Sequence, residues 1–282
     1  MNLIKLKKNF LNELKEIYPA GEIESFFYLL TSHYMNKGRL DVALQPEFTM
    51  QRSVKTRFEQ ALVQLKKEYP IQYIIGSTDF MGLPFEINES VLIPRPETEE
   101  LVSWIISLNH HKKALDILDI GTGSGCIPVS LAKDLEDARI DAIDLSEKAL
   151  VVAKKNAVLN QVDISFIQDD ILGIEQLDKT YDLIISNPPY VRESEKLSMH
   201  NNVLKYEPGM ALFVDDDDPL VFYKHIGKLA HAALKNRGEL FFEINQYLAD
   251  PLKELLRSYG FVNIEVKKDI YGADRMIRAV KN

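Results

Sequence analysis

Two spacings of hydrophobic residues divide the chain into a helical first part and an alternating remainder. Over residues 1–76, apolar side chains recur every three or four positions, which is the period of one face of an α-helix. The first such series consists of Leu3, Leu6, Phe10, Leu14 and Ile17. Residues 23–35 and 54–65 repeat the spacing. We therefore predict a small all-α domain over residues 1–76.

From residue 114 onward, short apolar runs alternate with longer segments of helical spacing. The predicted strands are 115–120, 139–144, 164–168, 181–186, 239–244, 263–268 and 275–280, and the predicted helices are 126–135, 146–160, 220–235 and 247–259. This alternation is typical of a mostly parallel sheet with helices on both faces. Because no helix separates the last two strands, we expect them to form an antiparallel hairpin at one edge of a seven-stranded sheet.

Residues 77–97 join these two patterns. Every second residue from Leu83 to Ile87 is apolar, as in a strand, and two prolines follow in "IPRPETE". Prolines interrupt regular structure and stiffen the backbone. We predict a short hairpin and a linker here, which makes residues 98–282 the second and larger domain.

The net charge of −8 is distributed unevenly along the chain. Residues 1–80 carry 11 basic and 9 acidic side chains, whereas residues 81–282 carry 23 and 33. Proteins that bind a nucleic-acid duplex usually present a basic face, because neutralising phosphates supplies most of their affinity. We therefore expect no direct binding of nucleic acid.

Cysteine content and hydropathy indicate the compartment. Cys126 is the single cysteine, so it cannot form an internal disulfide, and this fits a reducing compartment. No apolar run approaches the ~18 residues of a transmembrane helix. The Lys-rich start contains Glu13 and Glu16 and lacks Arg, unlike a transit peptide. We expect a cytoplasmic protein without membrane contact, and we interpret the start as its first helix.

The first predicted strand of the larger domain ends in a glycine-rich turn, "DIGTGSGCI". Asp119 precedes Gly121, Gly123 and Gly125, and Asp144 ends the next strand, 23 residues after Gly121. Glycines permit a tight turn and a close approach of the backbone to a ligand. An acidic residue after the second strand can accept hydrogen bonds from both hydroxyls of a ribose. The pattern predicts a nucleoside-type cofactor at the carboxyl ends of the strands.

The spacing of the glycines favours S-adenosylmethionine (SAM) over NAD. A dinucleotide site requires G-x-G-x-x-G, whereas this chain has G-x-G-x-G. The carboxylate of Asp119 would repel a pyrophosphate but suits a cationic amino-acid or sulfonium group. After the third strand, Asp170 can accept from an adenine amino group and Ile171 can pack on the ring. A solvated turn is the alternative for these two residues.

A second motif, "NPPY", ends the fourth predicted strand of the larger domain. Pro188 and Pro189 remove two backbone donors, which leaves nearby carbonyls free to accept, and Asn187 adds a side-chain carbonyl. Such a rigid set of acceptors can hold an NH₂ group whose nitrogen points at a methyl donor. Tyr190 offers a flat face for a planar acceptor. A plain turn after a strand is the alternative interpretation.

The combined motifs resemble those of a known family. A G-x-G-x-G loop with "NPPY" is similar to class I SAM-dependent methyltransferases, a Rossmann-like fold, that act on planar NH₂ groups. The segments "PIQYIIGSTDFMGLPFEINESVLIPRPETEELV", "ILDIGTGSGCIPVSLA", "YDLIISNPPYV" and "YEPGMALF" resemble the peptide chain release factor glutamine methyltransferases, the PrmC/HemK family. The resemblance covers nearly the whole chain.

The resemblance implies an activity and a set of site residues. The activity is protein-glutamine N5-methylation, with SAM as cofactor and class 1 release factors as protein substrates, and we expect a monomer without a metal. The cofactor set is Asp119, Gly121, Thr122, Gly123, Ser124, Gly125, Asp144, Asp170, Ile171 and Asn187. Asn187, Pro188, Pro189 and Tyr190 would bind the glutamine of the GGQ loop; Asn187, Pro188 and Tyr190 form the catalytic set. The domain of residues 1–76 would dock the release factor.

Several points stay open at the level of sequence. An adenine-N6 DNA methyltransferase shares "NPPY", a nicotinamide-dependent oxidoreductase shares the strand–turn–helix, and a silent SAM-binding module shares both motifs. Arg95 can serve as a structural ion pair or guide a substrate. Asn245 stands where family members usually have Gly, and we expect it to tolerate a left-handed turn. The long loop 191–219 is a candidate lid or binding surface.

Overall fold

The computed structural model describes residues 2–45 and 47–282. They form two compact units. The helical unit contains the described residues up to Gly76 together with His200–Tyr206, and the sheet unit contains Ser77–Met199 and Glu207–Asn282.

The helical unit is built around a cluster of aromatic side chains. Its helices are α1 (Leu3–Leu14), α2 (Ala20–Met35), α3 (Arg39–Leu44), α4 (Arg52–Leu65), α5 (Ile71–Ile75) and α9 (Asn201–Tyr206). The ring of Phe10 meets those of Phe27 and Phe58 edge-on, each with 5.9 Å between centroids, and all three are fully buried. Such contacts add to the free energy gained by burying each ring. Ile17 lies beyond the end of α1 and is partly exposed, so the predicted first series is one turn too long.

Helix α9 is distant in sequence from the rest of the helical unit. The hydroxyl of Tyr206 donates to the carbonyl oxygen of Lys67 over 2.8 Å, and its ring meets that of Tyr69 edge-on. The amide of Asn201 and the ammonium of Lys205 both contact the carboxylate of Glu68. Part of the predicted loop 191–219 therefore belongs to the helical unit.

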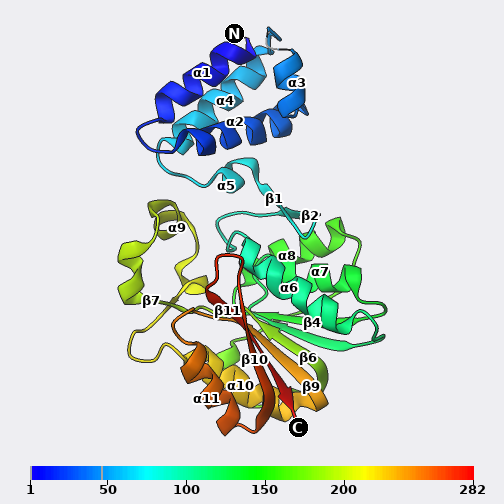
Figure 1. The fold of residues 1–282 in the computed structure, drawn as a ribbon. Helices are drawn as coiled ribbons and strands as arrows, with labels where there is room; N and C mark the ends of the chain where they lie inside the picture. Colours follow the sequence, from blue (N-terminus) through cyan, green and yellow to red (C-terminus); the bar gives the residue numbers. More distant parts are fainter. Residues whose placement is uncertain (1, 46) are drawn as a thin grey trace. The chain divides into compact units, whose positions relative to one another are not determined.

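The sheet unit contains a seven-stranded sheet and confirms the predicted α/β fold. Its strands are β3 (Asp116–Ile120), β4 (Arg139–Asp144), β5 (Ser165–Gln168), β6 (Tyr181–Ser186), β9 (Leu234–Glu243), β10 (Phe261–Lys268) and β11 (Asp274–Lys281), in the order β10-β11-β9-β6-β3-β4-β5. In this sheet β11 pairs antiparallel with β9 on one side and β10 on the other, and the other neighbouring strands pair parallel. The last two strands thus form the predicted hairpin at one edge (Figure 1).

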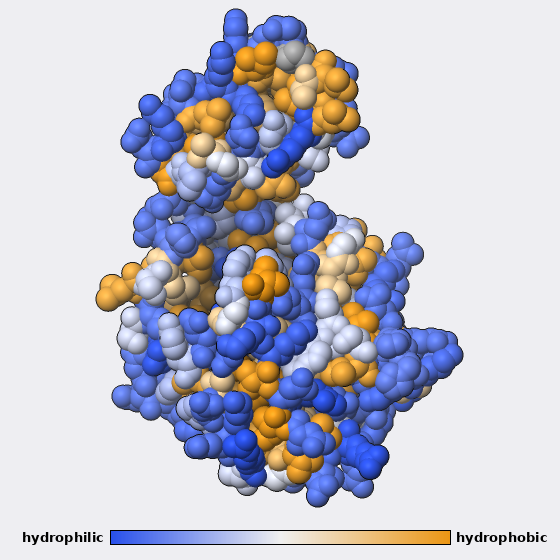
Figure 2. Space-filling view, in the orientation of Figure 1, coloured by the Kyte–Doolittle hydropathy of each residue, from blue (hydrophilic) through white to orange (hydrophobic). Residues whose placement is uncertain are grey.

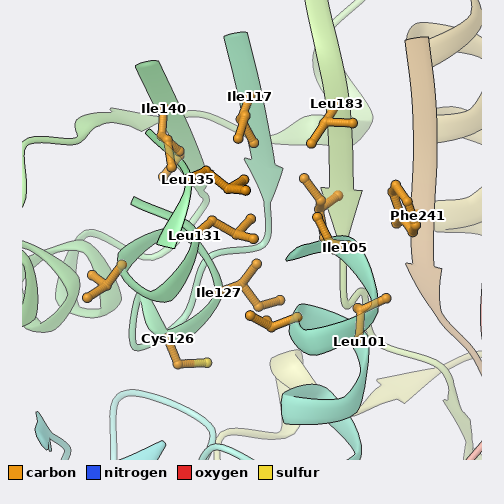
Figure 3. Close-up of a cluster of buried hydrophobic side chains, with 14 of the residues drawn as sticks. Leu101, Ile105, Ile117, Cys126, Ile127, Leu131, Leu135, Ile140, Leu183 and Phe241 are labelled. Atoms are coloured by element: carbon orange, nitrogen blue, oxygen red, sulfur yellow. The ribbon is translucent and has the colours of Figure 1, made fainter. Parts of the chain in front are cut away.

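Helices cover both faces of this sheet because alternate residues of each strand point to opposite sides. The helices are α6 (Pro96–Asn109), α7 (Cys126–Asp134), α8 (Glu147–Leu159), α10 (Val221–Ala233) and α11 (Ala249–Ser258). Ile117 of β3 packs in a cluster with α6 and α7, whereas the next residue, Leu118, packs in a second cluster with α10 and α11. Figure 3 shows Ile105 of α6 next to Leu183 of β6, and Leu101 of the same helix further along the first cluster.

Shorter elements complete the sheet unit. They are β1 (Ser77–Phe80) with β2 (Leu83–Glu86), β7 (Val191–Arg192) with β8 (Phe213–Val214), and the 3-10 helices η1 (Ile171–Gly173), η2 (Glu193–Ser198) and η3 (Gly209–Ala211). Figure 2 shows that the visible surface of the sheet unit is mainly hydrophilic, with apolar side chains in small separate groups. Within residues 2–45 and 47–282, no helix has the length and apolar character needed to cross a membrane.

Candidate active site

A cavity opens at the carboxyl edge of the sheet, where the central parallel strands β3, β4 and β6 end. Most of its wall comes from residues within 90–98, 120–127, 143–149, 169–171, 186–189 and 208–211, with two residues of α10. Ligands of open α/β sheets bind in this place, outside the carboxyl ends of the strands. The predicted glycine turn and the "NPPY" motif therefore meet in one cavity.

The glycine turn leaves β3 in a conformation that other residues rarely adopt. Gly121, Gly123 and Gly125 have φ of 78°, 55° and 80°, in the region that favours glycine. A Cβ on Gly121 would lie 3.9 Å from the main-chain oxygen of Asn187. A Cβ on Gly125 would lie only 3.1 Å from the Cβ of Ala153 on α8. The first glycine thus runs beside the "NPPY" motif, and the last lets α7 start close against α8.

Asp144 at the end of β4 braces the glycine turn. One carboxyl oxygen accepts from the backbone N–H of Gly123 and the other from that of Ser146, both over 2.8 Å. Burial raises the pKa of Asp144, and these two hydrogen bonds oppose that effect. Each oxygen keeps a second lone pair, and Asp144 lines the cavity. It is placed to accept hydrogen bonds from a ligand.

Asp119 is a buried carboxylate to which no described residue donates a hydrogen bond of standard geometry. It lies in β3, is fully buried, and neither of its oxygens has a hydrogen-bond partner of standard geometry among the described residues. Burial raises the pKa of its carboxyl to about 7. A buried polar group without a partner usually has a functional explanation, and a positively charged ligand group near the turn would supply one.

Two further predicted cofactor residues, Asp170 and Ile171, line the same cavity. One carboxyl oxygen of Asp170 accepts from the backbone N–H of Leu172 and caps η1. Ile171 packs against the apolar cluster formed with α10 and α11. Thr122 and Ser124 of the glycine turn also line the cavity and are buried.

The "NPPY" motif divides between the cavity and the interior. Asn187, Pro188 and Pro189 line the cavity. Tyr190 is not one of its lining residues, and its hydroxyl donates to the carboxylate of Glu243 over 2.9 Å. Burial raises the pKa of Tyr190 well above its usual value, so the hydroxyl stays protonated. The structure places the ring of Tyr190 as an anchor beside the cavity.

Sequence reasoning missed two residues that contact this motif. The amide nitrogen of Asn187 donates to the hydroxyl oxygen of Thr98 over 3.3 Å. That hydroxyl in turn donates to Glu243 over 2.6 Å. In the sequence, Thr98 is only the first residue of the larger predicted domain, and Glu243 lies within the predicted strand 239–244. Their separation of 145 positions gives no local signal that they meet.

The contacts of Arg95 and Asn245 answer the two questions that the sequence left open about them. Arg95 forms an ion pair with the buried Glu207 over 2.5 Å, and the other carboxyl oxygen of Glu207 accepts from the backbone N–H of Ile93. Arg95 is therefore engaged in a structural pair. Asn245 does not adopt a left-handed conformation, so the tolerance expected of it is not needed here. Its side-chain amide donates to the carbonyl oxygen of Tyr190 over 3.1 Å.

The donor set of the cavity fits a cationic nucleoside better than a pyrophosphate cofactor. The buried carboxylate of Asp119 and the partly exposed carboxylate of Asp144 lie at or beneath the turn, and both would repel phosphate. Arg95 is the one basic side chain among the described residues that line the cavity, and Glu207 already neutralises it. SAM carries an ammonium and a sulfonium group, so the residues present fit it.

Comparisons with known proteins bear on both units. A family model described as the PrmC N-terminal domain matches residues 7–76, and one described as the Methyltransferase small domain matches residues 101–207. Among solved structures, the 16S rRNA N2 G1207 methyltransferase of T. thermophilus, in complex with AdoMet and guanosine, is similar with a TM-score of 0.55. It is 16% identical, and the alignment covers 73% of this chain and 50% of that chain. This likeness extends to the fold alone.

Curated relatives cover almost the whole chain. The release factor glutamine methyltransferase of Flavobacterium psychrophilum is 54% identical over 275 residues, which is 96% of both chains. That of Bacteroides thetaiotaomicron is 41% identical over 94% of this chain and 95% of its own. That of Streptococcus pneumoniae is 38% identical over 98% of both. With this identity over this length, the chain belongs to the release factor glutamine methyltransferase family.

Proposed function

We propose that this protein transfers a methyl group from SAM to the side-chain amide nitrogen of the glutamine in the GGQ loop of class 1 peptide chain release factors. One observation carries the proposal. The glycine turn and Asn187 form adjacent walls of one cavity, with only 3.9 Å between a Cβ on Gly121 and the main-chain oxygen of Asn187. A cofactor held by the turn and an amide held by Asn187 would therefore be neighbours.

We assign the cofactor side of the cavity to the glycine turn and the acidic residues around it. When bound, SAM supplies a methyl group on a positively charged sulfur that leaves as a neutral thioether. Asp119 would balance the positive charge of the cofactor, since its carboxylate accepts no hydrogen bond of standard geometry from the described residues. Asp144 would accept from the ribose hydroxyls through its remaining lone pairs. Asp170 and Ile171 would receive the adenine.

We assign the acceptor side to the "NPPY" motif. The substrate amide has two N–H groups. One can donate a hydrogen bond to the side-chain oxygen of Asn187, and the other to the main-chain oxygen of Pro188. Holding both bonds aims the nitrogen lone pair toward the methyl group, which offsets the low nucleophilicity of an amide. As the N–C bond forms, the S–C bond breaks, and the methylated nitrogen then loses one proton to water. No dedicated base is required.

We assign docking of the release factor to the helical unit. Residues 1–80 carry 11 basic and 9 acidic side chains, while the remaining residues carry an excess of ten negative charges. The match of residues 7–76 to the PrmC N-terminal domain is consistent with a family-specific role for these helices.

We assign the protein to the cytoplasm. The single Cys126 supports this location, since a reducing compartment keeps thiols free.

The test of this function is methylation of a purified class 1 release factor with labelled SAM. We expect label on the release factor, and no label after Gln→Ala in its GGQ loop. Label that persists on this variant would contradict the assignment of the acceptor.

A second variant separates an enzyme from a silent SAM-binding module. Asn187→Ala should lower turnover by about 100-fold or more, as removal of a preorganised polar group does elsewhere, while SAM binding measured by calorimetry is largely kept. Equal turnover in Asn187→Ala and the wild type would remove Asn187 from the chemistry.

A further inference from the structure

Glu243 collects the hydrogen bonds that surround the "NPPY" motif. It ends β9 and its side chain is almost fully buried. One carboxyl oxygen accepts from the hydroxyl of Thr98 over 2.6 Å, and the other from the hydroxyl of Tyr190 over 2.9 Å. The main-chain oxygen of Glu243 accepts from the buried hydroxyl of Tyr223. Glu243 is not one of the residues that line the cavity, so any effect on the substrate must pass through its partners.

The direction of these hydrogen bonds determines how the amide of Asn187 is turned. A carboxylate only accepts, so the hydroxyl hydrogen of Thr98 points at Glu243. The oxygen of Thr98 can then only accept from its remaining neighbour, the side chain of Asn187. An amide offers a donor at its nitrogen and none at its oxygen. The NH₂ group of Asn187 therefore faces Thr98, and its carbonyl oxygen faces the other way.

Few other contacts are available to select this orientation. The oxygen and NH₂ of an Asn side chain are nearly equal in size, so packing alone distinguishes them poorly, and hydrogen bonding must decide. Thr98 is free for this purpose because it does not cap its own helix. It lies in the first turn of α6, whose N-terminal cap residue is Arg95, and its hydroxyl hydrogen bonds to Glu243, 145 positions away.

We propose that Thr98 and Glu243 are positioning residues, which hold the amide of Asn187 with its carbonyl oxygen toward the acceptor nitrogen. The proposal rests on the proposed function, because it concerns how the same site grips the glutamine amide. With the amide reversed, the NH₂ group of Asn187 would meet the NH₂ group of the substrate, and two donors would face each other. The acceptor would lose one of its two hydrogen bonds, and its lone pair would no longer be aimed.

The other end of the motif is held by the same carboxylate. Glu243 fixes the hydroxyl of Tyr190, and Asn245 donates to the carbonyl oxygen of Tyr190 over 3.1 Å. Pro188 and Pro189, which lie between Asn187 and Tyr190, have fixed φ angles. Tyr190 is thus hydrogen-bonded to Glu243 directly, and Asn187 is linked to Glu243 through Thr98. Both ends of the tetrapeptide are therefore held by hydrogen bonds that lead to one buried acidic group.

The test compares Thr98→Val, which keeps the shape and removes the hydroxyl, with Thr98→Ser, which keeps the hydroxyl. We expect Thr98→Val to lower kcat by about 10- to 100-fold, in the range for polar groups that act on a transition state. The dissociation constant of SAM should stay within about twofold, because calorimetry with SAM does not involve the acceptor. Thr98→Ser should restore most of kcat. A kcat for Thr98→Val equal to that of the wild type would overturn the proposal.

Two further variants separate positioning from a general loss of structure. Ser130 on α7 has a fully buried hydroxyl without a hydrogen-bond partner among the described residues, and Ser130→Ala should leave kcat unchanged. Glu243→Gln brings an NH₂ group into the network, which frees the hydroxyl of Thr98 to turn toward Asn187, and it should lower kcat even where Thr98→Val does not fold. An unchanged kcat in Glu243→Gln would equally contradict the proposal.

A double-mutant cycle gives the sharpest result. If Thr98 acts only through Asn187, then Thr98→Val should have no further effect on kcat in an Asn187→Ala background, because residues in one network are not additive. Additive losses would show that Thr98 acts elsewhere. The failure of the proposed function is distinguishable, since in that case the wild type itself does not methylate the release factor.

Discussion

Asp119, Asp144 and Glu243 are carboxylates near the reacting region, and they differ in their hydrogen bonding. Asp144 accepts from two backbone N–H groups, and Glu243 accepts from two hydroxyls. Asp119 has no such partner among the described residues. Hydrogen bonds stabilise the charged form of a carboxylate, and burial without them favours the neutral form. The protonation of Asp119 should therefore respond to a ligand more strongly than that of the other two.

The raised pKa of Asp119 predicts a pH dependence of stability and of SAM binding. Its pKa is about 7 in the folded protein, against 3.8 for an unperturbed group. Between these values the folded state retains a proton that the unfolded state has lost, so the free energy of unfolding should fall as pH rises from about 4 to about 7. A cationic ligand favours the ionised form, so binding of SAM near pH 6 should release protons.

Calorimetry in two buffers of different ionisation enthalpy measures this proton release. Asp119→Asn is the control, because it cannot ionise: it should release fewer protons on binding SAM, and its stability should depend less on pH in this window. Equal proton release by Asp119→Asn and the wild type would assign the proton to another group.

Local spacing decides which site residues could be found from sequence. The turn residues Gly121 to Gly125 and the tetrapeptide Asn187 to Tyr190 are contiguous, and Asp144 follows the turn at a recognisable interval. All three features could be predicted. Thr98 and Glu243 meet only because α6 packs against β9. Their hydrogen bond depends on tertiary structure, and no periodicity in the sequence encodes it.

At the scale of elements, strands and helices of the sheet unit were predicted from hydrophobic period, and their ends were predicted less well. Strand β9 starts at Leu234, directly after α10, instead of at 239. Residues 235–237, which follow the buried Leu234, are charged or polar, so alternation gives no signal there. Pairing of Leu234 with Tyr181 of β6 marks the start of the strand. Helix α9 was missed because it is short and its stability comes from contacts with distant residues.

The turn between β3 and α7 predicts the effect of adding one methyl group. Gly125→Ala would place a Cβ at positive φ and 3.1 Å from the Cβ of Ala153 on α8. We expect it to destabilise the protein by about 1–3 kcal/mol, the range for backbone strain with local overpacking, and to weaken SAM binding. Urea unfolding and calorimetry are the measurements.

Gly173 provides the matched control for this substitution. It does not have a positive φ, and the nearest atom to its added Cβ is 4.0 Å away. Gly173→Ala should change the free energy of unfolding by no more than about 0.5 kcal/mol, as at other unstrained positions. Similar losses in both variants would mean that Gly125 is not required by the turn.

At the scale of the whole molecule, the distribution of charge distinguishes this enzyme from an adenine-N6 DNA methyltransferase, the alternative that shares the "NPPY" motif. Residues 81–282 carry 23 basic and 33 acidic side chains, and the visible face of the sheet unit shows no extended apolar patch (Figure 2). Non-specific DNA binding depends on neutralised phosphates. We expect no increase in the fluorescence anisotropy of a labelled duplex at ~0.15 M salt with up to ~100 µM protein. Tight binding would instead favour an adenine-N6 DNA methyltransferase.

The path of the chain has a consequence for how such a protein can be rearranged. The polypeptide leaves the helical unit after Gly76, re-enters it at His200 and leaves again after Tyr206. A recombination that inherited residues 1–76 from another lineage would leave the old α9 against a foreign surface. Glu68 and its partners Asn201 and Lys205 would then be mismatched. Chimeras of this architecture should therefore be designed with two crossovers, so that both pieces of the helical unit come from one parent.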